Sequence, residues 1–272
     1  MVIIFRLLNI KTINKKTMLY RLRQIIKKNQ KIRLIVIKLK FLLNLGLERD
    51  AKILKKMKFN TTVDIGANNG YFTNMLLKVS KKVISFEPII YLYQLNLKLF
   101  KNKNVTFYNL ALGDKKSYGK INIPRDNDPE SSLINKFKNS YIQKVKISTG
   151  DEILQSKRID FIKIDVEGYE LFVLKGLKKI IKKNLPIFLI EIEKRHNKNY
   201  KEIFNYMINH NYKIFYLDKN NKFKIIEIKS ISKFIDRNQN FKKYKISAYL
   251  NNFWFINDKN NLTSYTKDKS YF

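Results

Sequence analysis

Residues 61–70 read TTVDIGANNG and are the most informative stretch of the 272-residue chain. Residues 61–65 are β-branched except at Asp64, which predicts a short strand, and residues 71–78 predict a helix. A glycine-rich turn between a strand and a helix lets a ligand approach the backbone closely. The glycine spacing is G-x-x-x-G, which differs from the G-x-G-x-x-G fingerprint of dinucleotide sites, and the G-K-[ST] sequence of a P-loop is absent. The turn therefore predicts a ligand site that is not built for a pyrophosphate.

Two acidic residues narrow the choice of ligand. Asp64 ends the first strand, where a carboxylate would repel a phosphate and attract a cation such as the ammonium of an amino acid. Glu87 follows the next predicted strand, 82–86, and lies 21 residues after Gly66. From that position an acidic side chain can accept both hydroxyls of a ribose. A phosphate-free nucleoside with an amino-acid arm satisfies both residues, so we predict S-adenosylmethionine as the cofactor. A solvated glutamate before a helix is the alternative interpretation of Glu87.

Farther along the chain, predicted strands alternate with predicted helices. This alternation is typical of a mainly parallel sheet covered by helices on both faces, in which ligands bind at the carboxyl ends of the strands. An insertion is expected to form a hairpin from residues 119–123 and 142–148. The remaining predicted strands are 105–109, 160–164, 186–192, 213–217 and 252–256, and the remaining predicted helices are 90–100, 170–182 and 200–210.

The residues that follow the later strands are the candidates for chemistry. Asn109 and Ala111 follow the third strand, and the small Ala111 would leave room for an adenine ring, although a plain turn explains it equally well. Asp165 follows an apolar run whose only polar residue is Lys163, and it is expected to point at the mouth of an active site. The candidates for a general base that removes a proton from an acceptor are Asp165, Glu191, Glu193 and His196.

Several strings, in this order along the chain, resemble the FkbM-type family of S-adenosylmethionine-dependent methyltransferases. KIDVEGYE at 163–170, followed by VLKG at 173–176, is the most specific of them. The similarity covers roughly residues 55–217. One departure is Gly150, where the family usually has leucine, and it concerns local packing more than chemistry. The other matching strings are VDIGANNG at 63–70, SFEP at 85–88, NLAL at 109–112 and the segment from Pro186 to Glu191.

The resemblance implies an α/β class I methyltransferase (Rossmann-like) fold. Its sheet has seven mostly parallel strands, the last of them antiparallel, with helices on both faces. The implied activity is O-methylation of a hydroxyl on a sugar, a glycan or a secondary metabolite. For cofactor binding it implies Asp64, Gly66, Asn68, Gly70 and Glu87, to which we add Asn109 and Ala111. For chemistry it implies Asp165 and Glu167, to which we add Glu191 and His196.

The composition limits the other functions. The chain has no cysteine and only two histidines, which excludes disulfides, thiolate nucleophiles and His-rich metal sites. Its net charge of +34 comes from 47 Lys but only 9 Arg, and Asn, Ile, Phe and Tyr are abundant as well. A genome rich in A and T produces this combination without selection for binding. We therefore expect a small-molecule or glycan acceptor and no nucleic-acid partner. We also expect no metal, although Asp165 and Glu191 are chemically suited to a divalent cation.

Two other function classes stay open as alternatives. An RNA or DNA methyltransferase would suit the charge, but the chain lacks an N-P-P-Y motif for methylation of amino groups. A methyltransferase-like fold could also serve as an interaction module without catalysis, but such a module would have no need of intact cofactor motifs.

The N-terminal part of the chain carries much of the charge. Residues 1–60 hold 17 Lys and Arg against Glu48 and Asp50, a net charge of +15. Leu and Ile alternate with Lys and Arg over residues 17–43, which predicts a basic amphipathic helix. This helix would pack on the main domain or on another subunit, or it would lie on an anionic membrane through residues 1–45.

The chain is expected to form one enzyme domain with two appendages. The apolar start is short and is interrupted by Arg6, so we expect neither a leader nor a membrane span. The predicted location is cytoplasmic, with the inner face of a membrane as a peripheral site. The expected domains are a basic helical extension (1–54), the methyltransferase domain (55–257) and a polar tail (258–272).

Overall fold

The computed structural model describes residues 29–43, 49–124, 132–133, 140–239, 249–259 and 265. The chain divides into two compact units, Met1–Gly46 and Leu47–Phe272. In the first unit, helix α3 (Gln30–Leu42) starts where Asn29 Oδ1 accepts the backbone N–H groups of Lys31 and Ile32. This helix is the described part of the predicted basic helix, of which residues 17–28 lie outside the described residues. No helix in the described ranges is long and apolar enough to cross a membrane.

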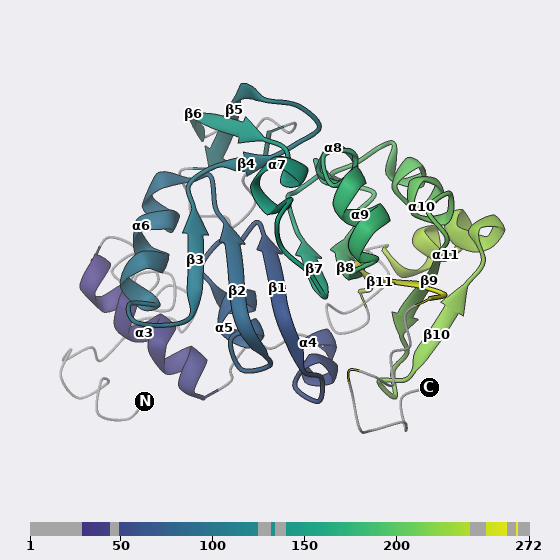
Figure 1. Cartoon of the computed structure of the whole chain (residues 1–272), viewed down its shortest axis with the longest axis horizontal. Helices are drawn as coiled ribbons and strands as arrows, with labels where there is room; N and C mark the ends of the chain where they lie inside the picture. Colours follow the sequence, from purple (N-terminus) through teal and green to yellow (C-terminus); the bar gives the residue numbers. More distant parts are fainter. Residues whose placement is uncertain are drawn as a thin grey trace, which may run out of the picture. The chain divides into compact units, whose positions relative to one another are not determined.

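The second unit is built on an eight-stranded sheet with the order β10-β9-β11-β8-β7-β1-β2-β3 (Figure 1). Strands β3, β2, β1, β7 and β8 are parallel, while β11 is antiparallel to both β8 and β9. This confirms the predicted class I methyltransferase fold, including its antiparallel seventh strand. The strands are β1 (Phe59–Ile65), β2 (Ser80–Phe86), β3 (Val105–Tyr108), β7 (Phe161–Ile164), β8 (Ile187–Glu191), β9 (Tyr212–Leu217), β10 (Phe223–Ile226) and β11 (Asn252–Asn257).

The expected number of seven strands is wrong, because β10 adds an eighth at the edge of the sheet. It pairs antiparallel with β9. The turn between them is held by Asp218 Oδ1, which accepts the backbone N–H groups of Asn220 and Lys222 at 2.8 and 2.9 Å. Only Phe223 and Ile226 of β10 are buried. Such a short strand with two apolar contacts has no alternating pattern to mark it in a tail rich in Asn and Lys.

Helices cover both faces of the sheet, as predicted. On one face, β-strand residues such as Val63 and Ile162 form a core cluster with side chains of α8, α9, α10 and α11. On the other face, Phe161 and Trp254 pack with α4 and α5. The helices are α4 (Arg49–Leu54), α5 (Tyr71–Leu76), α6 (Ile90–Leu99), α7 (Gly150–Leu154), α8 (Glu170–Lys175), α9 (Lys178–Asn184), α10 (Tyr200–Ile208) and α11 (Ile231–Asn238), with a 3₁₀ turn η1 (Ile228–Ser230).

The predicted single helix over 170–182 is wrong, because the chain breaks between α8 and α9 at Gly176. A Cβ on Gly176 would lie 1.9 Å from the carbonyl oxygen of Gly113. The Gly176 carbonyl also accepts the backbone N–H of Asp151 at 2.8 Å. The close approach of two backbone segments that are distant in sequence therefore interrupts the helix. The pattern of apolar residues over 170–182 does not reveal this interruption, because it arises from a tertiary contact.

A small second sheet, with the order β4-β6-β5, stands beyond the carboxyl ends of the parallel strands (Figure 1). Strands β5 (Ser117–Pro124) and β6 (Ser140–Ser148) form the predicted hairpin, and they are longer than expected. Strand β4 (Ala111–Leu112) pairs parallel with β6 at a place where we expected no strand. The small sheet thereby covers one side of the edge at which ligands are expected.

Candidate active site

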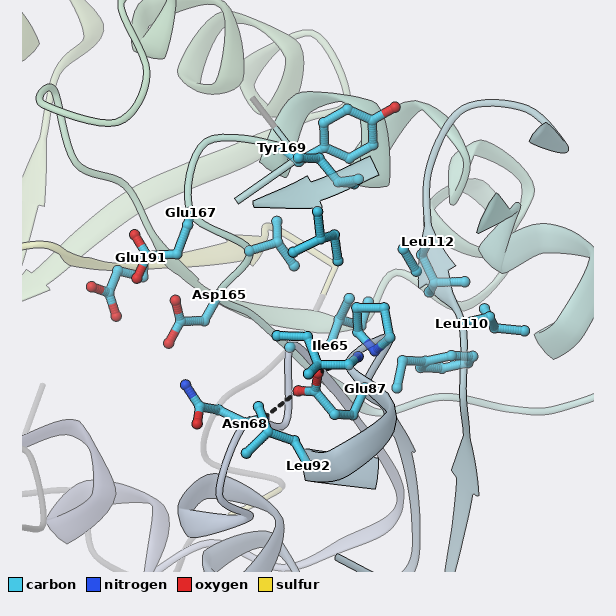
Figure 2. Close-up of a pocket in the computed structure, with 18 of the residues that line it drawn as sticks. Ile65, Asn68, Glu87, Leu92, Leu110, Leu112, Asp165, Glu167, Tyr169 and Glu191 are labelled. Atoms are coloured by element: carbon cyan, nitrogen blue, oxygen red, sulfur yellow. Dashed lines mark hydrogen bonds between the residues drawn. The ribbon is translucent and has the colours of Figure 1, made fainter. Parts of the chain in front are cut away.

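A pocket of about 350 Å³ opens at the carboxyl ends of β1, β2, β7 and β8 (Figure 2). Apolar side chains, among them Leu110 and Leu112, line one end, while the carboxylates of Asp165, Glu167 and Glu191 gather at the other. Within the described part of the chain, the lining residues are Ile65, Gly66, Asn68, Phe86, Glu87, Pro88, Ile89, Leu92, Leu110, Ala111, Leu112, Ile121, Leu133, Asp165, Val166, Glu167, Tyr169, Glu191 and Arg195.

The turn after β1 brings backbone close to the pocket. Gly66 has a φ of +88°, and a Cβ there would lie 1.9 Å from the carbonyl oxygen of Asp165. The N–H groups of Gly66 and Ala67 both donate to the carbonyl of Phe86, at 3.1 and 3.0 Å. Asn68 also has a positive φ, of 48°. Only glycine can occupy position 66 without displacing the backbone at the end of β7.

Glu87 is buried at the end of β2 and lines the pocket. Its Oε2 accepts the backbone N–H of Asn68 at 2.6 Å, drawn as a dashed line in Figure 2, and its Oε1 accepts the backbone N–H of Ile89 at 2.8 Å. Burial raises the pKa of Glu87 to about 7, although the two N–H donors oppose that rise. Each oxygen keeps a further lone pair, so this fixed carboxylate can accept two more hydrogen bonds from a ligand.

Asp64 lies beneath the turn and does not line the pocket. It is buried, and its Oδ2 accepts the hydroxyl of Thr73 at 2.5 Å. Within the described residues, its Oδ1 has no hydrogen-bond partner. Burial raises the pKa of Asp64 to about 6. The hydrogen bond from Thr73 thus ties the end of β1 to α5. The other carboxylate oxygen, Oδ1, keeps its capacity to accept a hydrogen bond.

Two further residues with predicted cofactor roles also lie behind the pocket wall. The Asn109 amide donates to the carbonyls of Glu87 and Pro88, at 2.9 and 3.0 Å, and so braces the end of β2. Gly70, with a φ of +77°, begins α5. The pocket wall itself includes Gly66, Asn68, Glu87 and Ala111 of the predicted cofactor residues.

Asp165 and Glu191 lie at the ends of the neighbouring strands β7 and β8, and both line the pocket. Lys163 Nζ lies 3.6 Å from Asp165 Oδ2 and 3.8 Å from Glu191 Oε2. Glu191 Oε1 also accepts the Asn251 amide at 2.6 Å. In the turn into α8, the side chain of Glu170 accepts the Gly168 N–H at 2.7 Å, so a side chain other than that of Asp165 holds this turn.

His196 lies in the loop after β8 and contacts the loop after β7 through its side chain, but it does not line the pocket. Its Nε2 lies 3.2 Å from Glu167 Oε2 and 3.3 Å from Glu193 Oε2. Burial opposes protonation, but these two carboxylates outweigh it and raise the pKa of His196. Glu193, which also accepts Arg195 Nε, has a lowered pKa despite its burial. His196 and Glu193 therefore form an ion pair behind the pocket wall. Glu167, with a φ of +52°, lines the pocket directly.

The site contains residues that the motifs did not single out. Arg195 and Tyr169 line the pocket, and Lys163 lies directly behind its carboxylates. A signal for Lys163 existed, because it is the only polar residue in the strand run 161–164. Arg195 follows β8 directly, but nothing in its sequence surroundings separates it from a surface residue.

Comparison with known proteins gives one family. A family model described as the methyltransferase FkbM domain matches residues 64–214. No curated protein matches the chain. Among solved structures, the methyltransferase FkbM of Methylobacillus flagellatus KT is 18% identical, with a TM-score of 0.46, over 74% of this chain and 44% of its own. The present chain thus spans less than half the length of that protein.

Two other solved structures show the same range of similarity. TrmK of M. capricolum, in complex with S-adenosylhomocysteine, is 13% identical, with a TM-score of 0.39, over 77% of this chain and 67% of its own. An rRNA methylase from Streptococcus thermophilus is 13% identical, with a TM-score of 0.42, over 76% of this chain and 93% of its own.

The family match includes every strand end that builds the pocket, from Asp64 to Glu191. It also spans more than half of the chain. The chain therefore belongs to the FkbM methyltransferase family.

Proposed function

We propose that the protein is an S-adenosylmethionine-dependent methyltransferase that methylates a hydroxyl of a sugar, a glycan or a secondary metabolite. The observation that carries the proposal is Glu87, a buried carboxylate fixed by two backbone N–H groups at the pocket wall. A ribose offers two adjacent hydroxyl donors, which this carboxylate can accept together.

The surrounding residues fit the rest of the cofactor. At the Gly66 turn the pocket wall is backbone without a side chain, so a ligand can approach it closely. Leu110, Ala111 and Leu112 offer an apolar surface to an adenine ring. Asp64 lies behind the wall, and its carboxylate would favour the ammonium through its negative charge. When bound, the cofactor supplies an activated methyl group on its sulfonium.

The residues of the chain would then provide alignment and a proton acceptor. Asp165 and Glu191 are favoured as the general base, because both line the pocket. Glu193 and His196 lie behind the wall and hold the loop that carries Glu167. A hydroxyl of the acceptor that donates to Asp165 or Glu191 would lose its proton to that carboxylate as its oxygen attacks the methyl group.

The acceptor would bind at the end of the pocket where Asp165, Glu167 and Glu191 lie, and the charge of this end favours a substrate with several hydroxyl groups. Three carboxylates line this end of the pocket and outnumber Arg195, the one cation among the described lining residues, although the whole chain carries a net charge of +34. Carboxylates accept hydrogen bonds from sugar hydroxyls and repel phosphodiesters. The pocket therefore supports a neutral glycan or metabolite over a nucleic acid as the acceptor.

The cofactor is tested by calorimetry with S-adenosylhomocysteine and with NAD. The protein should bind the former and not the latter. Glu87→Ala should weaken binding by at least about tenfold, because charged hydrogen bonds contribute roughly 1.5–3 kcal/mol each. Glu202→Ala, which removes an exposed carboxylate on α10, is the control and should bind normally. Unchanged affinity in Glu87→Ala would overturn the ribose assignment.

The acceptor is tested in cells with and without the gene. Mass spectrometry of glycans, lipids and small metabolites should reveal a species that differs by one methyl group. Methylation found only on RNA or DNA would contradict the proposed acceptor class.

For the N-terminal part we infer a peripheral contact with an anionic membrane. The support is the net charge of +15 in residues 1–60 together with helix α3, whose sequence alternates Lys and Arg with Ile and Leu. The protein would then work at the inner face of a membrane.

A further inference from the structure

The alternation of the strands brings four polar side chains to one face of the sheet. In β7, Ile162 and Ile164 face one core cluster and Phe161 faces the other, so Lys163 lies on the face of Phe161. By the same alternation, Asp64 of β1, Glu191 of β8 and Asn252 of β11 share that face. Asp64 is in register with Lys163, and Asn252 with Glu191.

Lys163 is surrounded by acceptors. Its Nζ lies 3.6 Å from Asp165 Oδ2, 3.8 Å from Glu191 Oε2 and 3.5 Å from Asn252 Oδ1. On the side of α5, the same nitrogen lies 5.1 Å from the ring centroid of Phe72. The side chain is only 2% exposed, so water is replaced almost entirely by protein groups.

A buried ammonium is unfavourable unless opposite charges surround it. An apolar side chain would fill the same space in β7 without that cost. The pocket carboxylates explain why a charge is present. Asp165 and Glu191 stand at neighbouring strand ends, where two negative charges would repel each other without a cation between them.

We infer that Lys163 is a positioning residue whose buried ammonium holds the Asp165 and Glu191 carboxylates together at the pocket wall. Its consequence for methyl transfer rests on the proposed function, because these carboxylates are the favoured proton acceptors.

The first test measures charge coupling by urea unfolding. Lys163→Met should lower the unfolding midpoint, because it leaves two carboxylates without their cation. Adding Asp165→Asn and Glu191→Gln should recover at least about half of the decrease in the urea midpoint, because the repulsion between the two carboxylates is then removed. Adding Glu202→Gln, a change at an exposed carboxylate on α10, should restore nothing.

The triple variant keeps the test decisive. If Lys163→Met does not fold while the triple variant does, the inference is supported. If the triple variant is as unstable as Lys163→Met, the aliphatic stem of Lys163 matters and its charge does not, which overturns the inference.

A second measurement follows Asp64 by carbon-13 NMR of its carboxyl group. Asp64 faces the Thr73 hydroxyl, Lys163 and Asp165, and Glu87 also senses its charge. Burial raises the pKa of Asp64 to about 6, Asp165 adds to the rise, and the Lys163 ammonium opposes it. Lys163→Met should move this titration upward by about one pH unit, and Lys163→Arg should keep it near 6. An unchanged titration in Lys163→Met would contradict the inference.

Neither measurement needs an acceptor or a cofactor. Binding of S-adenosylhomocysteine by the unmodified protein is measured alongside. Its absence would count against the proposed function and would leave the coupling of Lys163 to its carboxylates as measured.

Discussion

At the scale of the residue, the carboxyl group of Glu87 determines how the proposed cofactor site responds to pH. Burial raises the pKa of Glu87 to about 7 in the free protein. Ribose hydroxyls donate to the ionised form, so a proton on Glu87 competes with the ligand. Affinity for S-adenosylhomocysteine should therefore rise by about tenfold from pH 6 to pH 8.

Calorimetry at several pH values checks this dependence. In Glu87→Gln, which cannot ionise, affinity should be low and nearly independent of pH over the same range. A wild-type affinity that is flat between pH 6 and 8 would show that Glu87 does not change protonation on binding.

Asp165 carries the second prediction at this scale. Asp165→Asn should leave S-adenosylhomocysteine affinity nearly unchanged and should lower the melting temperature only modestly, because Glu170 holds the turn into α8 and Glu191 still lies beside the Lys163 ammonium. Turnover should fall by about 10²-fold or more, the scale of a lost general base. Turnover is measured with the acceptor that mass spectrometry identifies in cells without the gene. The melting temperature is measured on the same protein preparation. A lower melting temperature with turnover preserved would indicate a structural role.

At the scale of the element, the turn between β1 and α5 depends on the end of β7. Gly66→Ala would place a Cβ 1.9 Å from the backbone carbonyl oxygen of Asp165, at a φ of +88°. Because backbone cannot rotate away as a side chain can, the variant should lose about 3 kcal/mol or more of unfolding free energy.

Gly119→Ala in β5 is the matched control. Its Cβ would meet the side-chain ends of Leu133 and Ile147, at 2.8 and 2.9 Å, and both can shift. The expected loss is about 1 kcal/mol. Chemical unfolding of both variants compares them. Equal losses would show that the contact between the Gly66 turn and the Asp165 carbonyl is not rigid.

At the scale of the whole molecule, the basic N-terminal part should govern attachment to membranes. Removing residues 1–45 should leave S-adenosylhomocysteine binding unchanged, because the described residues that line the pocket lie between Ile65 and Arg195. Flotation with vesicles rich in phosphatidylserine should be lost, and high salt should weaken it in the full-length protein. Full-length protein that does not float with these vesicles would favour a packed helix over a membrane contact.

The sequence determined the order of the elements and the places where ligands meet the chain. The glycine turn at 66–70, the acidic end of β2 and the strand run 161–164 are local signals, since propensity, periodicity and turn chemistry act over a few residues. The parallel sheet, the helices on both faces and the antiparallel β11 followed from them and from the family resemblance. The location of Glu87 at the pocket wall was predictable for the same reason.

Only the tertiary structure decided which of these residues share a surface. Asp64 and Asn109 end strands as expected, yet Thr73 and the loop at Pro88 hold them behind the wall. The break at Gly176 depends on a contact with Gly113, which is far away in sequence. The edge strand β10 is marked by only two buried side chains. Lys163 is the clearest case, because its charge has meaning only once β7 and β8 bring Asp165 and Glu191 to the same nitrogen. The sequence marks Lys163 as the only polar residue of its strand run, but the electrostatic interactions that give it a role act through space and depend on packing.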